Sequence, residues 1–377
     1  MVRELPYGGA ETYALLLSRG LAELGHEVSV LTEGGPLENR FSESGIEVAR
    51  EPDLGRRSLR AVARRIAACG FDIMNAHHYR SARVTHVLHR LTGVPYIMTV
   101  HARRSLAMRA VVRYWSDLVL VLSEEIATTL RGPFGVPRDR VRVSFPPVDT
   151  YACRPAAPPE DVARRYLREP GGQLILHVSR LTYRKKRPAR ALVEAMPGLL
   201  RRFPGALLLI VGHGEGARDV GAAIERLTGA CGQVAVLEGP RPGLADLMNL
   251  ATVTVGTGLV AREALACACP VVAAGRRGYL GPVNAGNLDA MLAANFGDWG
   301  ACPEDVSADA VLRGLTEVLS DSARWRGEAD ELSRRVAAEL TPRAAAAEVF
   351  EVYREVIERR RADGSQSVVR AGRRAHR

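Results

Sequence analysis

Short apolar runs alternate with longer amphipathic segments along most of this chain, and this alternation limits the folds open to it. In the first half the apolar runs cover residues 26–31, 71–74, 96–100 and 118–122, with helical patterns over 10–24 and 82–91. In the second half they cover residues 174–178, 207–211, 234–237, 253–255 and 271–274. Strands that are apolar throughout are buried on both faces of a sheet. The pattern therefore predicts an α/β protein with doubly wound, Rossmann-like parallel sheets covered by helices.

The length of the chain predicts two domains. A chain of 377 residues with 47% hydrophobic content can bury two separate cores. A Pro-rich stretch near residues 145–159 marks the expected boundary, which gives an N-terminal domain over 1–155 and a C-terminal domain over 156–340. A terminal helix over 341–361 can cross back to the N-terminal domain, and 362–377 is predicted to be a basic, disordered tail. Residues 1–7 are poorly strand-like, so the first strand is expected to be short or missing.

Composition favours a cytoplasmic protein. No apolar run approaches the roughly 20 residues that span a bilayer, and no signal-peptide pattern begins the chain. The six cysteines have unrelated spacings and no second Cys/His pair stands at zinc spacing, so we expect reduced thiols and no metal site.

Positive charge is concentrated between residues 50 and 115. This stretch holds thirteen arginines against Glu51, Asp53 and Asp72, a local excess equal to the net charge of +10 of the whole chain. It has few aromatic residues for stacking and no nucleic-acid-binding motif, so we expect no nucleic-acid partner. An anionic membrane surface or an acidic acceptor fits the charge, and so does a merely solvated face.

Lysine occurs at only two positions among the 52 basic residues. Lys185 and Lys186 stand side by side between the strand-like run 174–178 and a helix-like run over 188–200. An ammonium group is a compact point charge that suits phosphate oxygens, and α/β proteins bind anions between a strand end and a helix start. The alternative is a solvated loop.

Two adjacent glycines, Gly8 and Gly9, precede the first amphipathic segment. They would let the backbone approach a phosphate at the start of a helix, although the two glycines alone favour a plain loop. The segment Gly8-Gly-Ala-Glu, with its helix and the later Gly25-His-Glu-Val-Ser-Val, resembles the opening of the GT-B-fold retaining glycosyltransferases of the large family-four group.

The resemblance extends over roughly residues 8–360. Segments 71–77 and 94–102 resemble strand ends that line the acceptor side, so His77 is an acceptor-side candidate and His101 a catalytic candidate near the donor sugar. Segment 179–188 resembles the Arg-Leu…Lys motif that neutralises the donor diphosphate. The resemblance assigns that role to Arg180 and to one lysine, with Lys186 slightly preferred over Lys185.

Residues 256–272 resemble the family segment in which two glutamates, eight positions apart, contact the donor. Gly258 and Glu263 match it, and Glu263 takes the position that bonds the nucleotide ribose. The first glutamate position falls on Val255, and Cys269 and 274–279 also depart from the pattern. The departures indicate a divergent subfamily.

The resemblance implies metal-independent transfer of a sugar from a nucleotide-diphosphate sugar, with retention of configuration. The acceptor would be a small molecule, a glycan or a lipid-linked compound, and a lipid acceptor would place the enzyme on the inner face of the plasma membrane. Two alternatives stay open: a nucleotide-sugar-binding protein that no longer transfers, prompted by Val255, and a related sugar-nucleotide enzyme such as an epimerase.

Overall fold

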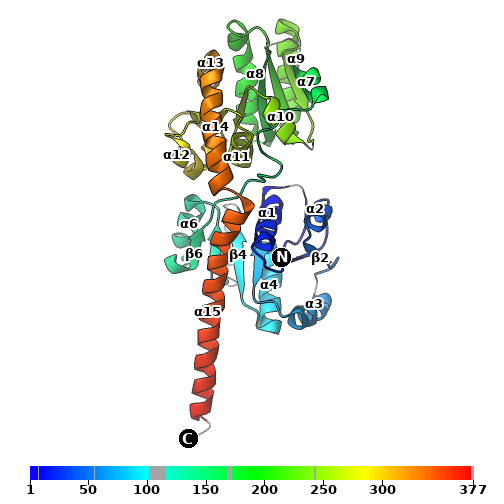
Figure 1. Cartoon of the computed structure of the whole chain (residues 1–377), viewed down its shortest axis with the longest axis vertical. Helices are drawn as coiled ribbons and strands as arrows, with labels where there is room; N and C mark the ends of the chain where they lie inside the picture. The colour runs from blue at the N-terminus through cyan, green and yellow to red at the C-terminus, as the bar shows by residue number, and fades with distance from the viewer. Residues whose placement is uncertain are drawn as a thin grey trace. The chain divides into compact units, whose positions relative to one another are not determined.

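The computed structural model describes residues 1–6, 8–54, 56–101, 116–167, 172–182, 184–241 and 243–374. The chain divides into a first unit, residues 1–147 with 340–377, and a second unit, residues 148–339. Figure 1 colours the elements of both units along the chain. Residues 148–155, which the sequence assigns to the first domain, belong to the second unit. The Asn249 side chain of that unit donates to the Arg154 carbonyl and accepts from the Ala156 amide.

The first unit is built on parallel strands. Its strands are β1 (Ser29–Thr32), β2 (Glu47–Arg50), β3 (Met74–His77), β4 (Tyr96–Val100), β5 (Val119–Val121) and β6 (Val141–Val143), and β3 to β6 form a sheet in sequence order. Its helices are α1 (Gly9–Glu23), α2 (Glu38–Glu43), α3 (Arg56–Cys69), α4 (Tyr79–Thr92), α6 (Glu124–Arg131), η2 (Arg138–Arg140) and α15 (Pro342–Arg374). Strand β3 begins where the predicted run 71–74 ends, because its pairing with β4 starts at Met74 and Tyr96.

The segment before α1 takes the place of a first strand. Val2 forms a parallel bridge with His77, and its amide donates to the Leu31 carbonyl at 3.1 Å. Val2 therefore lies between β1 and β3 and joins the two sheets of the unit. The expected first strand is present only as this single bridge.

The terminal helix α15 packs along α1 within the first unit (Figure 1). The rings of His26 and Phe350 stack at 4.2 Å, and the Asn75 side chain donates to the Tyr353 hydroxyl at 2.8 Å. The helix continues to Arg374, through residues that the sequence assigns to a disordered tail, and 375–377 lie outside the described residues.

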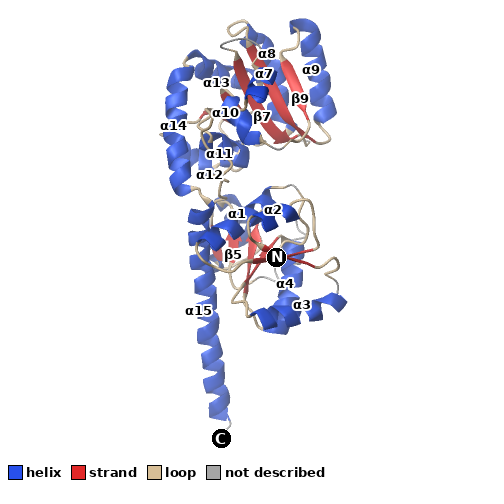
Figure 2. Cartoon of the chain, turned by 45° about the vertical axis from the view of Figure 1, so that its right-hand side comes forward, coloured by secondary structure: helices blue, strands red, loops and turns tan. Residues whose placement is uncertain are grey.

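The second unit holds one sheet in the order β12-β11-β10-β7-β8-β9, parallel except for the edge strand β12. Its strands are β7 (Gln173–Arg180), β8 (Ala206–His213), β9 (Ala235–Glu238), β10 (Val253–Gly256), β11 (Val271–Ala274) and β12 (Tyr279–Pro282). Its helices are α7 (Glu160–Tyr166), α8 (Lys186–Leu200), α9 (Ala217–Cys231), α10 (Leu244–Leu250), α11 (Gly258–Ala266), α12 (Leu288–Ala293), η3 (Asn295–Gly297), α13 (Ala308–Ser320) and α14 (Ser322–Glu339). Figure 2 shows these helices flanking the strands. The α/β class and the doubly wound sheets predicted from the sequence are confirmed.

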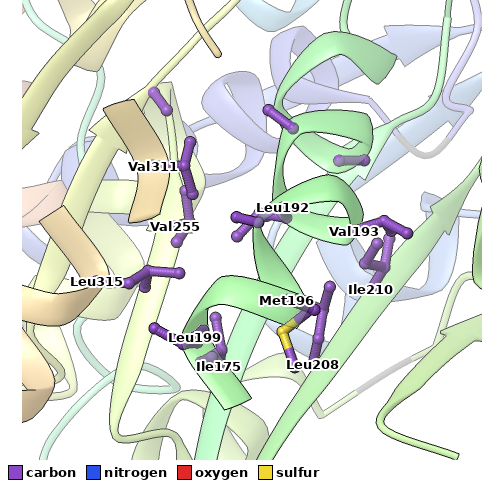
Figure 3. Packing of buried hydrophobic residues seen from close by; sticks show 14 of the residues in the cluster. Ile175, Leu192, Val193, Met196, Leu199, Leu208, Ile210, Val255, Val311 and Leu315 are labelled. Carbon is purple, nitrogen blue, oxygen red and sulfur yellow. The ribbon is translucent and has the colours of Figure 1, made fainter. Parts of the chain in front are cut away.

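The core of the second unit forms where α8 and α13 cover the sheet (Figure 3). Leu192 and Met196 of α8 and Leu315 of α13 are fully buried against Ile175 and Val255 of the strands. The apolar period of α8 places these side chains on one face, as its amphipathic sequence predicts. This packing holds the carboxyl ends of β7 and β10, and the residues that follow them, in a rigid frame.

Candidate functional site

In each unit, the candidate residues lie at the point where the strand order changes, with strands added first on one side of a central strand and then on the other. In the second unit β8 and β9 lie on one side of β7, and β10, β11 and β12 lie on the other. In the first unit β1 and β2 lie on one side of Val2, and β3 to β6 lie on the other. Open α/β sheets bind ligands outside the carboxyl ends of the strands at such switch points.

The switch point of the first unit carries a cluster of histidines. His77 ends β3 and is 5% exposed, and its Nδ1 lies 3.1 Å from Nε2 of His101, with the two rings stacked. The Tyr13 ring meets the His101 ring edge-on at 5.1 Å. The structure therefore brings the two predicted histidines together.

Burial keeps both of these histidines neutral. It lowers the pKa of His101 to about 3, with a further contribution from neighbouring His78, and it lowers the pKa of His77 well below its usual value. Each ring can then donate one hydrogen bond and accept one. Nδ1 of His101 is buried and has no hydrogen-bond partner among the described residues.

Sequence reasoning missed His78, which follows His77 directly in the sequence. It stands immediately before α4 with φ 78° and ψ 155°, a region that side-chain-bearing residues rarely adopt. Its Nε2 lies 3.1 Å from Oε1 of Glu11, a residue of α1 that is 8% exposed. The available signal was the doubled histidine at a strand end, directly before a helical pattern.

The two glycines at the start of α1 differ in what surrounds them. A Cβ on Gly8 would lie 2.4 Å from Oε2 of Glu11, whereas a Cβ on Gly9 would meet nothing within 4 Å. Gly8 therefore makes room for the carboxylate that holds His78. The predicted donor-binding role of Gly8 and Gly9 stays a prediction, and both residues belong to the first unit.

The switch point of the second unit carries one exposed and two half-exposed cations, Arg180 with Lys185 and Lys186. Arg180 is the last residue of β7, and its guanidinium pairs with no carboxylate of the described residues. Lys186 begins α8 and its Nζ lies 2.9 Å from Oδ2 of Asp219, while Nζ of Lys185 lies 3.4 Å from Oδ2 of Asp298. The hydrogen bond from Lys186, with the charge of Arg190, holds the pKa of the Asp219 carboxyl below its usual value.

Glycines at the end of β8 and in the turn that follows it pack against this segment. A Cβ on Gly212 would lie 1.9 Å from the Ser179 carbonyl oxygen. A Cβ on Gly216 would lie 2.7 Å from both the Leu181 carbonyl oxygen and Cδ of Lys186. These glycines let the turn approach the Arg180 to Lys186 segment closely.

The connection from β10 to α11 is a single residue, Thr257. Gly258 follows with φ 60°, and Glu263 lies half-buried on the second turn of α11. Val255, eight positions before Glu263, lies inside β10, and its fully buried side chain packs with Leu192 and Leu315 (Figure 3). The position assigned to a donor-contacting glutamate is thus a core position in this chain.

Arg262, beside Glu263, is a second residue that sequence reasoning missed. Its side chain is 1% exposed, and Nε and Nη2 have no hydrogen-bond partner among the described residues. Burial lowers the pKa of this guanidinium to about 10. The described residues contain no group of three His, Cys, Asp or Glu side chains that could hold a metal ion.

Two family models match the chain, one in each half. The model of Glycosyltransferase Family 4 matches residues 7–151, and the model of Glycosyl transferases group 1 matches residues 172–301. Together they cover His77, His78 and His101 and the region from Arg180 to Glu263.

Known proteins match over most of the chain. A D-inositol 3-phosphate glycosyltransferase of Catenulispora acidiphila is 27% identical over 326 residues, which are 74% of this chain and 77% of that protein. A crystal structure of a glycosyltransferase from Rickettsia africae superposes with a TM-score of 0.75 at 16% identity, covering 94% of this chain and 98% of the other. The Anabaena protein HepE in complex with UDP gives a TM-score of 0.72 at 17% identity, covering 94% and 99%.

Proposed function

Because this chain belongs to the GT-B-fold glycosyltransferases of the family-four type, and is therefore a glycosyltransferase, we propose that it transfers a sugar from a nucleotide-diphosphate sugar to an acceptor hydroxyl with retention of configuration. The observation that carries the donor class is the set of cations at the second switch point, Arg180, Lys185 and Lys186. The structural relative HepE was crystallised with UDP, which supports a nucleoside diphosphate as the leaving group.

The cations would act on charge that develops during the reaction. As the bond from the anomeric carbon to the diphosphate breaks, negative charge grows on the leaving oxygens, and fixed positive groups stabilise it. The acceptor oxygen forms the new bond, and its proton passes to an oxygen of the departing diphosphate. We propose that Arg180 and Lys186 carry this charge without a metal ion, that Glu263 and Gly258 hold the donor, and that His101 lies near the donor sugar.

The two alternatives are not favoured. Val255 at a glutamate position prompted the first of them, a protein that binds donor without transfer, and this residue lies in the core. The comparisons contain glycosyltransferases and favour neither a binding protein nor an epimerase.

We further propose a cytoplasmic enzyme that rests on anionic lipid when its acceptor is lipid-linked. In α3, Arg60, Arg64 and Arg65 are exposed, while Leu59 and Val62 are buried beneath them. The arginines of 102–115, which the charge count includes, lie outside the described residues. No described helix has the length and apolar character needed to cross a membrane.

Vesicle flotation tests this lipid contact. The protein is expected to float with phosphatidylglycerol vesicles but not with phosphatidylcholine vesicles, and binding independent of anionic lipid would contradict the proposal.

A thermal-shift screen with UDP, GDP, ADP and dTDP tests the donor class. A nucleotide present at 100 times its Kd stabilises a protein by about 2.7 kcal/mol, so one of the four should raise the melting temperature. The same nucleotide should have little effect on Arg180→Ala. If none of the four shifts the wild-type protein, the proposed donor class is wrong.

A further inference from the structure

A tight turn after α12 joins the candidate donor residues of the second unit. It contains Asn295, Phe296 and Gly297, whose φ angles are 48°, 56° and 94°, and it ends at Asp298. Residues with side chains rarely adopt such left-handed values, and they keep them only where the surrounding structure fixes the backbone. The Phe296 side chain is fully buried and anchors the turn. The turn therefore holds Asp298 in a set position.

Asp298 links two cations that follow different strands. Its Oδ2 lies 3.4 Å from Nζ of Lys185, which follows β7. Its Oδ1 accepts a hydrogen bond at 3.2 Å from the backbone amide of Arg276, two residues after the end of β11. Nε of Arg276 also donates to the Asp298 carbonyl at 3.2 Å. Because Lys185 is one of the cations proposed to bind the donor, Arg276 stands directly beside the diphosphate site.

The same turn contacts the start of α11. Oγ1 of Thr257 donates to the Asn295 carbonyl at 2.8 Å, and a Cβ on Gly258 would lie 3.2 Å from Nδ2 of Asn295. Strand β10 lies between β7 and β11 and is parallel to both, so the carboxyl ends of the three strands meet at one edge of the sheet. Arg180, Gly258 and Arg276 follow one another along this edge, and Arg276 lies farthest from Arg180.

The Arg276 guanidinium is fixed on one side and open on the other. Its Nε is bonded to Asp298, its side chain is 39% exposed, and Nη1 and Nη2 have no hydrogen-bond partner among the described residues. The Asp298 carboxylate is shared with Lys185, so one negative charge stands against two positive charges. A guanidinium held in this way can bind a carboxylate through two parallel hydrogen bonds.

Two departures from the family pattern change the charge of the donor side in the same direction. Val255 supplies no carboxylate at the position of the first family glutamate, and the divergent segment 274–279 supplies Arg276 and Arg277. Both departures leave this side of the second unit more positive than the pattern that it resembles. Complementary charge selects a partner, so a more positive site favours a donor with a negative charge beyond its diphosphate.

We propose that the donor sugar carries a carboxylate, as a hexuronic acid does, and that Arg276 binds this carboxylate. This inference rests on the proposed function, because it takes a nucleotide-diphosphate sugar as the donor. It adds the chemical class of the sugar and a residue that determines specificity for it. Asp298 is the positioning residue that holds the guanidinium beside the diphosphate cations.

The test is isothermal titration calorimetry of the full-length protein with hexuronate and hexose derivatives of the nucleotide that the thermal-shift screen selects. For UDP, UDP-glucuronate and UDP-galacturonate are compared with UDP-glucose and UDP-galactose. At least one uronate should bind wild-type protein about tenfold or more tightly than its neutral partner, the effect of a charged hydrogen bond. In Arg276→Gln this preference should disappear, while the affinity for the neutral compound should change by less than about twofold.

Arg277→Gln is the matched control, because it removes the same charge one residue away, and it should keep the preference for the uronate. Arg276→Lys keeps the charge without the two parallel hydrogen bonds and should keep part of the preference. Equal binding of uronate and neutral compound to wild-type protein, a preference that survives Arg276→Gln, or the same loss in Arg277→Gln would overturn the proposal.

The free nucleotide is titrated into the same samples, which separates this proposal from the proposed function. If the nucleotide does not bind wild-type protein, the donor class is wrong and the sugar class is lost with it. If the nucleotide binds but no uronate is preferred, only the sugar class is wrong. A melting temperature measured for each variant shows whether a lost preference comes with a lost fold.

Discussion

The two switch points have the same topology and opposite chemistry. In the first unit the strand ends carry His77 and His101, which burial keeps neutral, and His78, whose Nε2 lies beside the Glu11 carboxylate. In the second unit they carry Arg180, Lys185 and Lys186, which are exposed or half-exposed cations. The fold thus sets where a ligand binds, and the side chains at the strand ends set its charge. A cationic strand end suits a diphosphate.

The largest expected effect is on the free energy of unfolding, and it tests whether Val255 belongs to the core or to the donor site. Val255→Glu would bury a carboxylate among Leu192, Leu315 and Ile175, so we expect a loss of about 4 kcal/mol or more in the free energy of unfolding. Val255→Ala is the matched control and should cost only about 2 kcal/mol. Urea denaturation measures both. A stable Val255→Glu variant with raised turnover would instead place this residue in the donor site.

The second largest effect is on kcat/KM, and it distinguishes the role of Lys186 from that of Lys185. Lys186→Ala should lower kcat/KM by about 100-fold or more if its ammonium stabilises the leaving diphosphate. It should lower the free energy of unfolding by less than about 1 kcal/mol, because its ion pair with Asp219 is partly solvated.

Lys185→Ala is the control for this prediction, since the Lys185 side chain is as exposed as that of Lys186 and its ion pair with Asp298 is longer. Steady-state kinetics with the nucleotide found by thermal shift measures both variants. Near-normal turnover in Lys186→Ala would remove this lysine from the donor site, and a larger loss in Lys185→Ala would exchange their roles.

The smallest effect is a difference in acid sensitivity between the units. Burial lowers the pKa of His77 and of His101 in the first unit, and it lowers the pKa of His177 in the second unit to about 4. Each of these residues takes up a proton near pH 6.5 when unfolded but stays neutral in the folded protein. Their stabilisation is therefore present above about pH 6.5 and is lost as the pH falls, by about 1.4 kcal/mol per pH unit for each histidine.

Hydrogen exchange at several pH values between 6.5 and 5 resolves this difference by unit. The first unit also contains His86, whose pKa is lowered by burial, so it should lose protection more than twice as steeply as the second. His101→Gln should make the slope of the first unit shallower. Equal slopes in the wild-type protein would show that the His77 and His101 rings are not buried as a neutral pair.

Most strands and the doubly wound class were predictable because their apolar runs are local signals. The cations at 180, 185 and 186 were predictable for the same reason, since a strand-like run precedes them and a helical one follows. The strand β3 was placed too early, because the sequence shows the apolar residues Phe71 and Ile73 but not the pairing with β4 that starts at Met74.

The sequence by itself determined that two parallel-sheet units exist, which strand ends carry polar residues, and where positive charge is concentrated. Only the tertiary structure decided that Glu11 holds His78, that Gly8 makes room for that carboxylate, and that Val255 belongs to the core. The reason is physical. A strand or helix pattern depends on residues within a few positions, whereas a side chain's partner depends on segments that the fold brings together, here residues 11 and 78.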